Sequence, residues 1–227
     1  MTVIADLSHH ETVDWSVTGK VLDFAILRVQ DGSRVVDREY KKNVTGCKAY
    51  GVPFGNYAFC RFVSENDAKI EARDFWERGD KDAKIWFADI EQDTMSDMRA
   101  GTQAFIDELY RLGAQRVGVY VGHHKYRQYQ VDKLQRVEAV WIPRYGGKKP
   151  DFPCDIWQYT ETGRLQGVSG EVDLNYLNNG YTLEKLTGVP KVKANYFVTG
   201  GFNDPAAIAK MKEFMEQNGW WYEVKEG

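Results

Sequence analysis

The sequence predicts an α/β fold built as a closed, TIM-like barrel. Short apolar runs rich in β-branched and aromatic residues recur along the chain, and charged, helix-like stretches separate the first of them. Strands that alternate with helices form parallel βαβ units, which leaves a closed barrel or a doubly wound sheet as alternatives. The count favours the barrel, because about eight strands is the number in a TIM-type barrel.

The first part of the chain supplies five strands that are each followed by a helix-like segment. The strands are expected at residues 3–7, 24–29, 52–59, 85–90 and 117–121. The clearest helices are expected at residues 38–50, 65–79, 98–112 and 125–136. In the second of these helices, Ser64 is a candidate N-cap and Gly79 a candidate stop signal.

The rhythm changes after residue 136. Three further strands are expected at residues 139–142, 156–159 and 172–174, with loops and no clear helix between them. The predicted barrel therefore lacks its last helices.

The sequence of the C-terminal tail indicates a separate small segment. We expect a barrel domain over residues 1–182, a linker over 183–193 and a βαβ segment over 194–227. The segment's strands are expected at 194–199 and 220–224, with a turn at 200–204 and a helix at 205–217. Asp204 before Pro205 is typical of a helix start. A segment of this size buries little apolar surface by itself. We therefore expect it to dock on the barrel or to form a homo-oligomer.

Composition excludes several classes of partner and cofactor. Thirty basic and thirty-three acidic residues leave a formal net charge of −3, which predicts no attraction to nucleic acid or an anionic membrane. No stretch is long enough to insert in a membrane. The three cysteines have irregular spacings that fit neither a disulfide framework nor a zinc site. We expect no cofactor and no metal, since the pairs His9-His10 and His123-His124 also lack a metal-binding spacing.

The strongest candidate for chemistry is a pair of acids at the end of an apolar strand. Asp89 and Glu91 stand two residues apart in the run Trp86-Phe87-Ala88-Asp89-Ile90-Glu91, so their side chains share a face. Catalytic groups of βα barrels lie at the carboxyl ends of strands. Asp37 and Glu39 have the same spacing, but they open a polar helix and are expected to be solvated there. The alternative for Asp89 and Glu91 is a structural ion-pair network.

Two other acids occupy similar positions. Asp6 ends the first strand, and Asp173 lies on the last strand. The first and last strands of a closed barrel are neighbours, so Asp6 and Asp173 are expected to converge with Asp89 and Glu91 over one mouth. Carboxylates in one cleft raise each other's proton affinity. Taken singly, Asp6 and Asp173 also fit turn or cap positions.

An ordered set of motifs resembles the lysozymes of glycoside hydrolase family 25. The opening motif consists of Asp6, Ser8, Asp14 and Trp15. The other landmarks follow in order at residues 24–28, 55–59, 89–91, 118–120, 141–145, 157–159 and 172–175. The resemblance covers about residues 3–180, and the ordered set is far more specific than any single motif.

The resemblance implies a barrel of five βα units closed by three further strands. It also implies hydrolysis of the β-1,4 bond between N-acetylmuramic acid and N-acetylglucosamine in peptidoglycan. Glu91 would be the general acid, and Asp89 would orient the substrate's acetamido group or stabilise the positive charge at the sugar ring. Asp6 and Asp173 would tune protonation and position the ring. The expected substrate contacts are Tyr57, Tyr120, Trp141, Tyr145 and Gln158, with packing as the alternative for Trp141 and Tyr120.

The tail is similar to the short cell-wall-binding segments of endolysins. The start of the sequence has no basic segment and apolar run of a signal peptide, so we expect a phage endolysin that stays in the host cytoplasm until a holin releases it.

The rival functions are a non-catalytic wall-binding barrel, an amidase or peptidase, and a phosphate-handling barrel. A wall-binding barrel has no need of both acids at the Asp89 strand end, and an amidase or peptidase needs a zinc set or a Cys-His pair. A phosphate-handling barrel needs a glycine-rich loop after a late strand, which residues 162–170 resemble only faintly.

Overall fold

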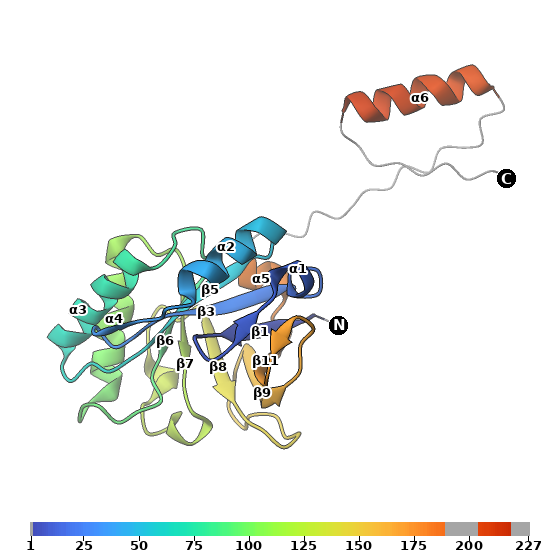
Figure 1. The fold of residues 1–227 in the computed structure, drawn as a ribbon. Coiled ribbons are helices and arrows are strands. Elements are labelled where there is room, and N and C mark those ends of the chain that lie inside the picture. Colours follow the sequence, from blue (N-terminus) through green and yellow to red (C-terminus); the bar gives the residue numbers. More distant parts are fainter. Residues whose placement is uncertain (1, 189–203, 219–227) are drawn as a thin grey trace. The chain divides into compact units, whose positions relative to one another are not determined.

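The computed structural model describes residues 2–188 and 204–218 (Figure 1). The chain divides into two compact units, residues 1–190 and 191–227. In the second unit the structure describes helix α6 (Pro205–Gln217), which Asp204 caps by accepting from the backbone N–H of Ala206. The helix has the predicted bounds. The strands predicted at 194–199 and 220–224 and most of the turn between them lie outside the described residues.

The first unit is a closed barrel of eight strands, which confirms the predicted fold (Figure 1). Its strands are β1 (Ile4–Leu7), β3 (Phe24–Asp31), β5 (Phe54–Phe59), β6 (Trp86–Asp89), β7 (Val117–Tyr120), β8 (Ala139–Pro143), β9 (Ile156–Gly163) and β11 (Val172–Leu177). Neighbouring strands from β1 to β9 run parallel, and β11 closes the barrel between β9 and β1, antiparallel to both. The amino end of β11 therefore lies at the carboxyl end of the other strands.

Four α-helices follow the first four parallel strands of the barrel. They are α1 (Trp15–Thr18), α2 (Tyr40–Tyr50), α3 (Glu65–Arg78) and α4 (Met98–Leu112). The Ser64 hydroxyl caps α3 by accepting from the N–H of Asp67, as predicted, and Asp97 caps α4 in the same way. Helices α3 and α4 lie side by side on the outside of the barrel (Figure 1). No helix of the described part of the chain is long and apolar enough to cross a membrane.

The fifth connection differs from the prediction. The helix predicted over residues 125–136 is wrong, because the structure has two 3-10 turns, η1 (His123–Lys125) and η2 (Val131–Lys133). Gln130 and Arg136 have φ values of 50° and 60°, in the left-handed region that ends a right-handed helix. The apolar residues that suggested a helix, such as Tyr129 and Val131, are buried under this loop instead.

Three short strands were not predicted. Strand β2 (Thr12–Val13) pairs with β10 (Val168–Ser169) in a separate two-stranded sheet, and β4 (Val35–Val36) pairs with β3. Two-residue strands carry no alternation that a sequence pattern can reveal.

The apolar core has two layers, one inside the barrel and one between the strands and the helices. The inner layer comes from alternate strand residues, including Ile4, Phe24, Ile26, Tyr57, Ile85, Phe87, Tyr120, Trp141 and Ile156. Gly118 belongs to this layer because a Cβ there would lie 2.3 Å from the Phe87 ring. The inner layer is therefore packed solid below the level of the candidate acids.

Helix α5 (Leu183–Thr187) closes the amino end of the barrel. Leu186 is fully buried in the inner layer, next to Leu183 and Tyr181. Arg116 fixes the helix by donating to the carbonyl oxygen of Leu186 at 2.6 Å and to the hydroxyl of Tyr181 at 2.8 Å. The segment expected to start a linker at residue 183 is thus part of the barrel unit.

We expect Leu186→Ala to destabilise the barrel, because the truncation leaves a cavity at its closed end. The free energy of unfolding should fall by about 2–4 kcal/mol. Urea unfolding followed by tryptophan fluorescence measures the change. Ile70→Ala is the matched control, since Ile70 is 42% exposed on α3. An equal loss in both variants would mean that α5 does not seal the barrel.

Candidate active site

Four carboxyl groups meet at the open end of the barrel. Asp6 and Asp89 lie at the carboxyl ends of β1 and β6, and Glu91 follows two residues after Asp89. Asp173 is the second residue of β11 and pairs directly with Asp6 in the antiparallel register. The reversed direction of β11 therefore brings Asp173 to the same rim as the other three acids.

Asp6 and Asp173 are neighbouring buried acids on adjacent strands. The Asp6 carboxylate accepts from the Asn175 amide at 2.8 Å and from the Gln158 amide at 3.2 Å. Burial raises the pKa of Asp6 to about 6, although these hydrogen bonds oppose the rise. Burial and the neighbouring Asp6 charge raise the pKa of Asp173 to about 9. Each of the two carboxyl groups therefore holds its proton to higher pH than an exposed aspartate does.

Asp89 is a buried carboxylate that lacks full hydrogen bonding. It is 5% exposed, and its Oδ1 atom has no hydrogen-bond partner among the described residues. Burial raises the pKa of Asp89 well above its ordinary value, and the charges of Glu91 and Asp6 add to the rise. An unpartnered buried carboxylate is costly for the free protein, so this oxygen is available to a ligand.

Glu91 is more open than Asp89. Its side chain is half-buried at the end of β6, and burial raises the pKa of the carboxyl group. The nearby charges of Arg61 and His124 lower the pKa in part. Glu91 is thus an accessible carboxyl group that keeps its proton to higher pH than an exposed glutamate does.

Gln158 links the acid pair to two tyrosines. Its amide nitrogen donates to Asp6, and its carbonyl oxygen accepts from the hydroxyls of Tyr120 at 3.1 Å and Tyr145 at 2.8 Å. Tyr120 is buried, whereas Tyr145 is 40% exposed at the rim. Three of the expected substrate contacts are therefore joined by hydrogen bonds, namely Tyr120, Tyr145 and Gln158. Of the two tyrosine rings, Tyr145 is the one exposed to solvent.

Trp141 and Tyr57 lie lower in the barrel. Trp141 is 1% exposed, donates from Nε1 to the Asn175 side chain at 2.7 Å and packs edge-on against Tyr120 and Tyr57. A substrate contact at Trp141 does not fit this burial, so the packing alternative is the one that the structure supports. Tyr57 is also buried, and its hydroxyl lies in the electrostatic field of Asp6 and Asp89.

A second group of charged side chains lies near the mouth of the barrel. Arg28 was not predicted from the sequence, and Asp37 was predicted incorrectly. Arg28 on β3 donates from Nε to Asp37 at 2.9 Å, and Asp37 also accepts from the backbone N–H of His9 at 2.9 Å. The charge of Arg28 lowers the pKa of Asp89. Asp37 was expected to be solvated at a helix start; that expectation is wrong, because Asp37 is buried and α2 begins at Tyr40. The inward alternation of Phe24, Ile26 and Arg28 was the available signal.

Arg61, which follows β5, occupies the rim beside Glu91. Its guanidinium group forms a two-bond contact with Asp31, at 2.6 and 3.1 Å, and also donates to the side chain of Gln92. The guanidinium carbon lies 4.4 Å from the centre of the Phe59 ring. Arg61 is therefore held rigidly next to the candidate acid.

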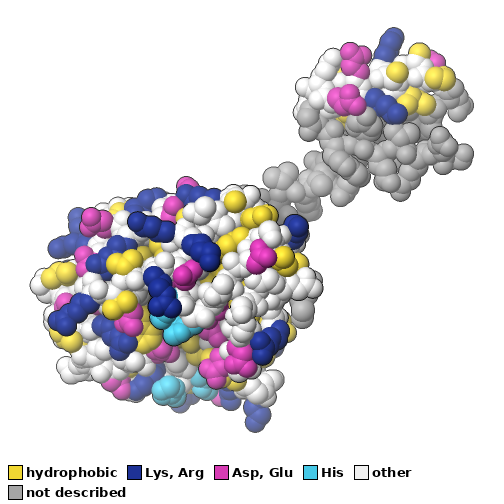
Figure 2. All heavy atoms as spheres, viewed as in Figure 1, with side chains coloured by type: hydrophobic (Ala, Val, Ile, Leu, Met, Phe, Trp, Pro, Cys, Tyr) yellow, Lys and Arg dark blue, Asp and Glu magenta, His cyan; other side chains and the backbone are white. Residues whose placement is uncertain are grey.

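Histidine side chains share the surface of the barrel unit with acidic side chains (Figure 2). His123 contacts Asp151 and Arg144 in a rim cluster, and the charge of His124 acts on Glu91. Within residues 2–188 and 204–218 no group of three or more possible ligands is placed to hold a metal ion. His123 thus takes part in a cluster of polar contacts at the rim.

Comparisons of the sequence and of the fold with known proteins identify the same family. A family model described as "Glycosyl hydrolases family 25" matches residues 5–168. The uncharacterized protein YegX of Escherichia coli O6:H1 is 22% identical over 192 residues, which span 78% of this chain and 69% of YegX. Two solved structures each cover 83% of this chain. The glycosyl hydrolase 25 GHIP of Streptococcus pneumoniae has a TM-score of 0.77 at 26% identity over 92% of that chain. The catalytic domain of endolysin ply40 from bacteriophage P40 of Listeria monocytogenes has a TM-score of 0.76 at 27% identity over 98% of that chain.

Proposed function

Because the chain belongs to glycosyl hydrolase family 25 and is a lysozyme-type glycoside hydrolase, we propose that it is a muramidase with Glu91 as its general acid. The bond that it would hydrolyse is the β-1,4 linkage between N-acetylmuramic acid and N-acetylglucosamine in peptidoglycan. The observation that carries the proposal is the pairing of the open Glu91 carboxyl with the buried Asp89 carboxylate at the mouth of the barrel.

The two carboxyl groups divide the work of the reaction. Glu91 donates its proton to the glycosidic oxygen as the bond to the anomeric carbon breaks, which makes the departing sugar a neutral alcohol. The oxygen of the substrate's own acetamido group then bonds to the anomeric carbon, and Asp89 orients the acetamido N–H through its unpartnered oxygen. Water completes the hydrolysis, and Glu91 takes back a proton. Retention of the β configuration at the new reducing end supports this route, and inversion excludes it.

The other site residues hold this arrangement. Asp6 and Asp173, whose pKa values are both raised, would tune protonation and position the ring bound above them. Gln158 fixes Asp6 and ties down Tyr145, whose exposed ring offers a flat face for a sugar. Tyr57 and Tyr120 line the floor of the mouth.

Release of new reducing ends from purified Gram-positive peptidoglycan tests the proposal. Mass spectrometry should find fragments that end in muramic acid. Free amino groups without reducing ends would move the protein to the amidase or peptidase class, although its three thiols are at most 1% exposed. Binding to the wall with no released fragment would favour a non-catalytic wall-binding barrel.

We further propose that the protein is a phage endolysin that waits in the host cytoplasm for a holin. The similarity to the catalytic domain of endolysin ply40 supports this role. Expression in a Gram-positive host with and without a holin tests it, since lysis should occur only with the holin. Residues 194–227 would bind the wall or join copies of the chain, and the mass in solution with and without residues 191–227 distinguishes the two roles.

A further inference from the structure

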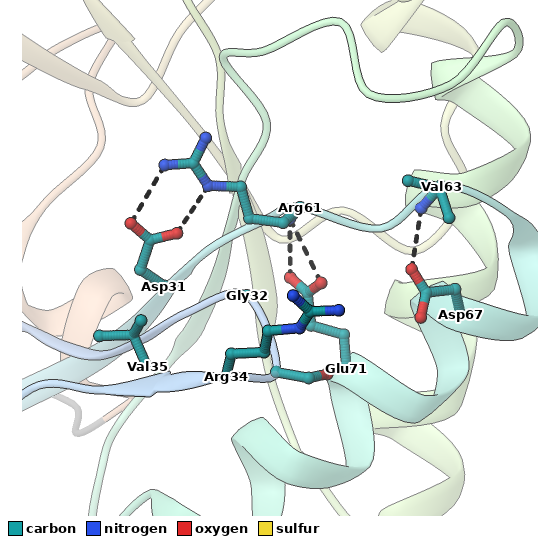
Figure 3. A pocket seen from close by; sticks show the side chains of 9 residues that line it. Asp31, Gly32, Arg34, Val35, Arg61, Val63, Asp67 and Glu71 are labelled. Carbon is teal, nitrogen blue, oxygen red and sulfur yellow. Dashed lines mark hydrogen bonds and ion pairs between the residues drawn. The ribbon is translucent and has the colours of Figure 1, made fainter.

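A polar pocket of about 540 Å³ opens beside the candidate active site (Figure 3). Its walls are the turn between β3 and β4, the segment after β5, and helix α3. Polar side chains and two valines line it, among them Asp31, Arg34, Val35, Arg61, Val63 and Asp67. None of the four candidate catalytic acids lines it.

The acids of the pocket already have partners within the protein. Asp31 binds the Arg61 guanidinium, Asp67 accepts from the backbone N–H of Val63 at 2.9 Å, and Glu71 accepts from the backbone N–H of Arg61 at 3.0 Å (Figure 3). Arg34 differs from these groups. It is exposed and forms no hydrogen bond or ion pair with any residue in the described ranges. Arg34 is therefore the charge in the pocket that is free to bind a ligand.

The pocket also offers small apolar surfaces and a buried hydroxyl. Val35 is 54% exposed and Val63 is 67% exposed, so both aliphatic side chains are accessible to a ligand. The hydroxyl of Ser33 is buried and has no hydrogen-bond partner among the described residues. The accessible lining thus combines a free cation with two small aliphatic faces.

Arg61 connects the pocket to the reaction centre. One side of its guanidinium group binds Asp31 in the pocket wall, and the other side binds Gln92, the residue after Glu91. The Arg61 side chain therefore links the wall of the pocket to the residue next to Glu91, the proposed general acid.

We propose that this pocket binds the peptide stem that muramic acid carries, with a stem carboxylate on Arg34 and alanine methyl groups on Val35 and Val63. The inference rests on the proposed muramidase function. While the stem is attached, the lactyl carboxyl group of muramic acid is an amide, so the sugars of the strand carry no charge. A peptide stem carries carboxylates and alanine side chains, and it branches from the sugar next to the cleaved bond. Charge and shape therefore select the stem over the glycan.

Two substrates and one charge reversal test the proposal. The substrates are glycan strands freed of teichoic polymers, either with intact stems or with the stems removed by an amidase. Arg34→Glu should lower kcat/KM by about tenfold on strands with stems and have no such effect on strands without stems, because the lactyl carboxylate that the amidase frees lies on the sugar and not at the distance of the stem carboxylates. Lys69→Glu is the matched control, since Lys69 is exposed on α3 outside the pocket. It should behave like the wild type on both substrates.

Binding of a free stem supplies a readout that does not need hydrolysis. The tetrapeptide L-Ala-γ-D-Glu-L-Lys-D-Ala should shift the amide NMR signals of residues around Val35 and Val63 in the wild type and in Lys69→Glu, and not in Arg34→Glu. An equal loss on both substrates, or peptide binding that is unchanged by Arg34→Glu, would overturn the pocket assignment. A wild type that binds the peptide and releases no reducing ends would overturn the muramidase proposal alone.

Discussion

Replacing Glu91 by glutamine should nearly abolish the release of reducing ends from peptidoglycan. A positioned general acid contributes about 10²- to 10⁴-fold to a rate, and we expect kcat to fall within that range. Glutamine keeps the size and hydrogen-bonding shape of the side chain but has no acidic proton for the departing sugar. The KM should change little, because the amide still fits the site.

The pH profile separates a chemical role of Glu91 from a structural one. Burial raises the pKa of Glu91, so the wild type should keep its acid form to higher pH than an exposed glutamate and lose activity as the pH rises through that raised pKa. The residual activity of Glu91→Gln should lack this alkaline limb. Glu77→Gln, an exposed change on α3, is the control and should match the wild type. A wild-type profile in Glu91→Gln would remove Glu91 from the proton transfer.

The position of these acids could be predicted because strand and barrel geometry is periodic. A carboxylate that ends an apolar run must lie at the rim, and this rule placed Asp89 at the end of β6 and Asp6 at the end of β1. Helix α4 was predicted with its observed bounds because its apolar residues recur at the helical spacing and Gly113 ends it in the left-handed conformation.

The errors have a common physical cause, which is that tertiary contacts override local patterns. Asp37 has the composition of an exposed helix start, yet the Arg28 side chain and the His9 backbone bury it. The segment from residue 183 contains Gly188 and Pro190, which are typical of a linker, yet Leu186 packs into the amino end of the barrel. The rigid position of Arg61 depends on Asp31, thirty residues earlier in the sequence, which no local pattern reports.

The second large effect is expected at Asp89, where activity and stability should change in opposite directions. Asp89→Asn removes the negative charge that faces the reacting sugar and its acetamido group, so kcat should fall by about 100-fold or more. The same change removes a buried carboxylate whose Oδ1 atom has no hydrogen-bond partner among the described residues. At pH 8 the free energy of unfolding should therefore rise by about 1–3 kcal/mol.

The sign of the pH dependence identifies the cause of that stability gain. The folded pKa of Asp89 lies well above the unfolded value, because burial and the charges of Glu91 and Asp6 oppose ionisation. The favourable contribution of protonated Asp89 is complete below the unfolded pKa and is lost as the pH rises through the folded pKa. Asparagine has no such titration. The stability difference between Asp89→Asn and the wild type should thus be small near pH 4 and grow toward pH 8.

Urea unfolding at both pH values, together with the reducing-end assay, measures the two effects in the same variants. Asp107→Asn is the matched control, since Asp107 is exposed on α4 and its contact with Arg136 is 3.9 Å long. This control should leave both activity and the pH dependence of stability unchanged. If Asp89→Asn were less stable than the wild type at pH 8, the carboxylate would have a partner that stabilises its charge in the free protein. Its proposed role as the unpaired group awaiting the substrate would then be wrong.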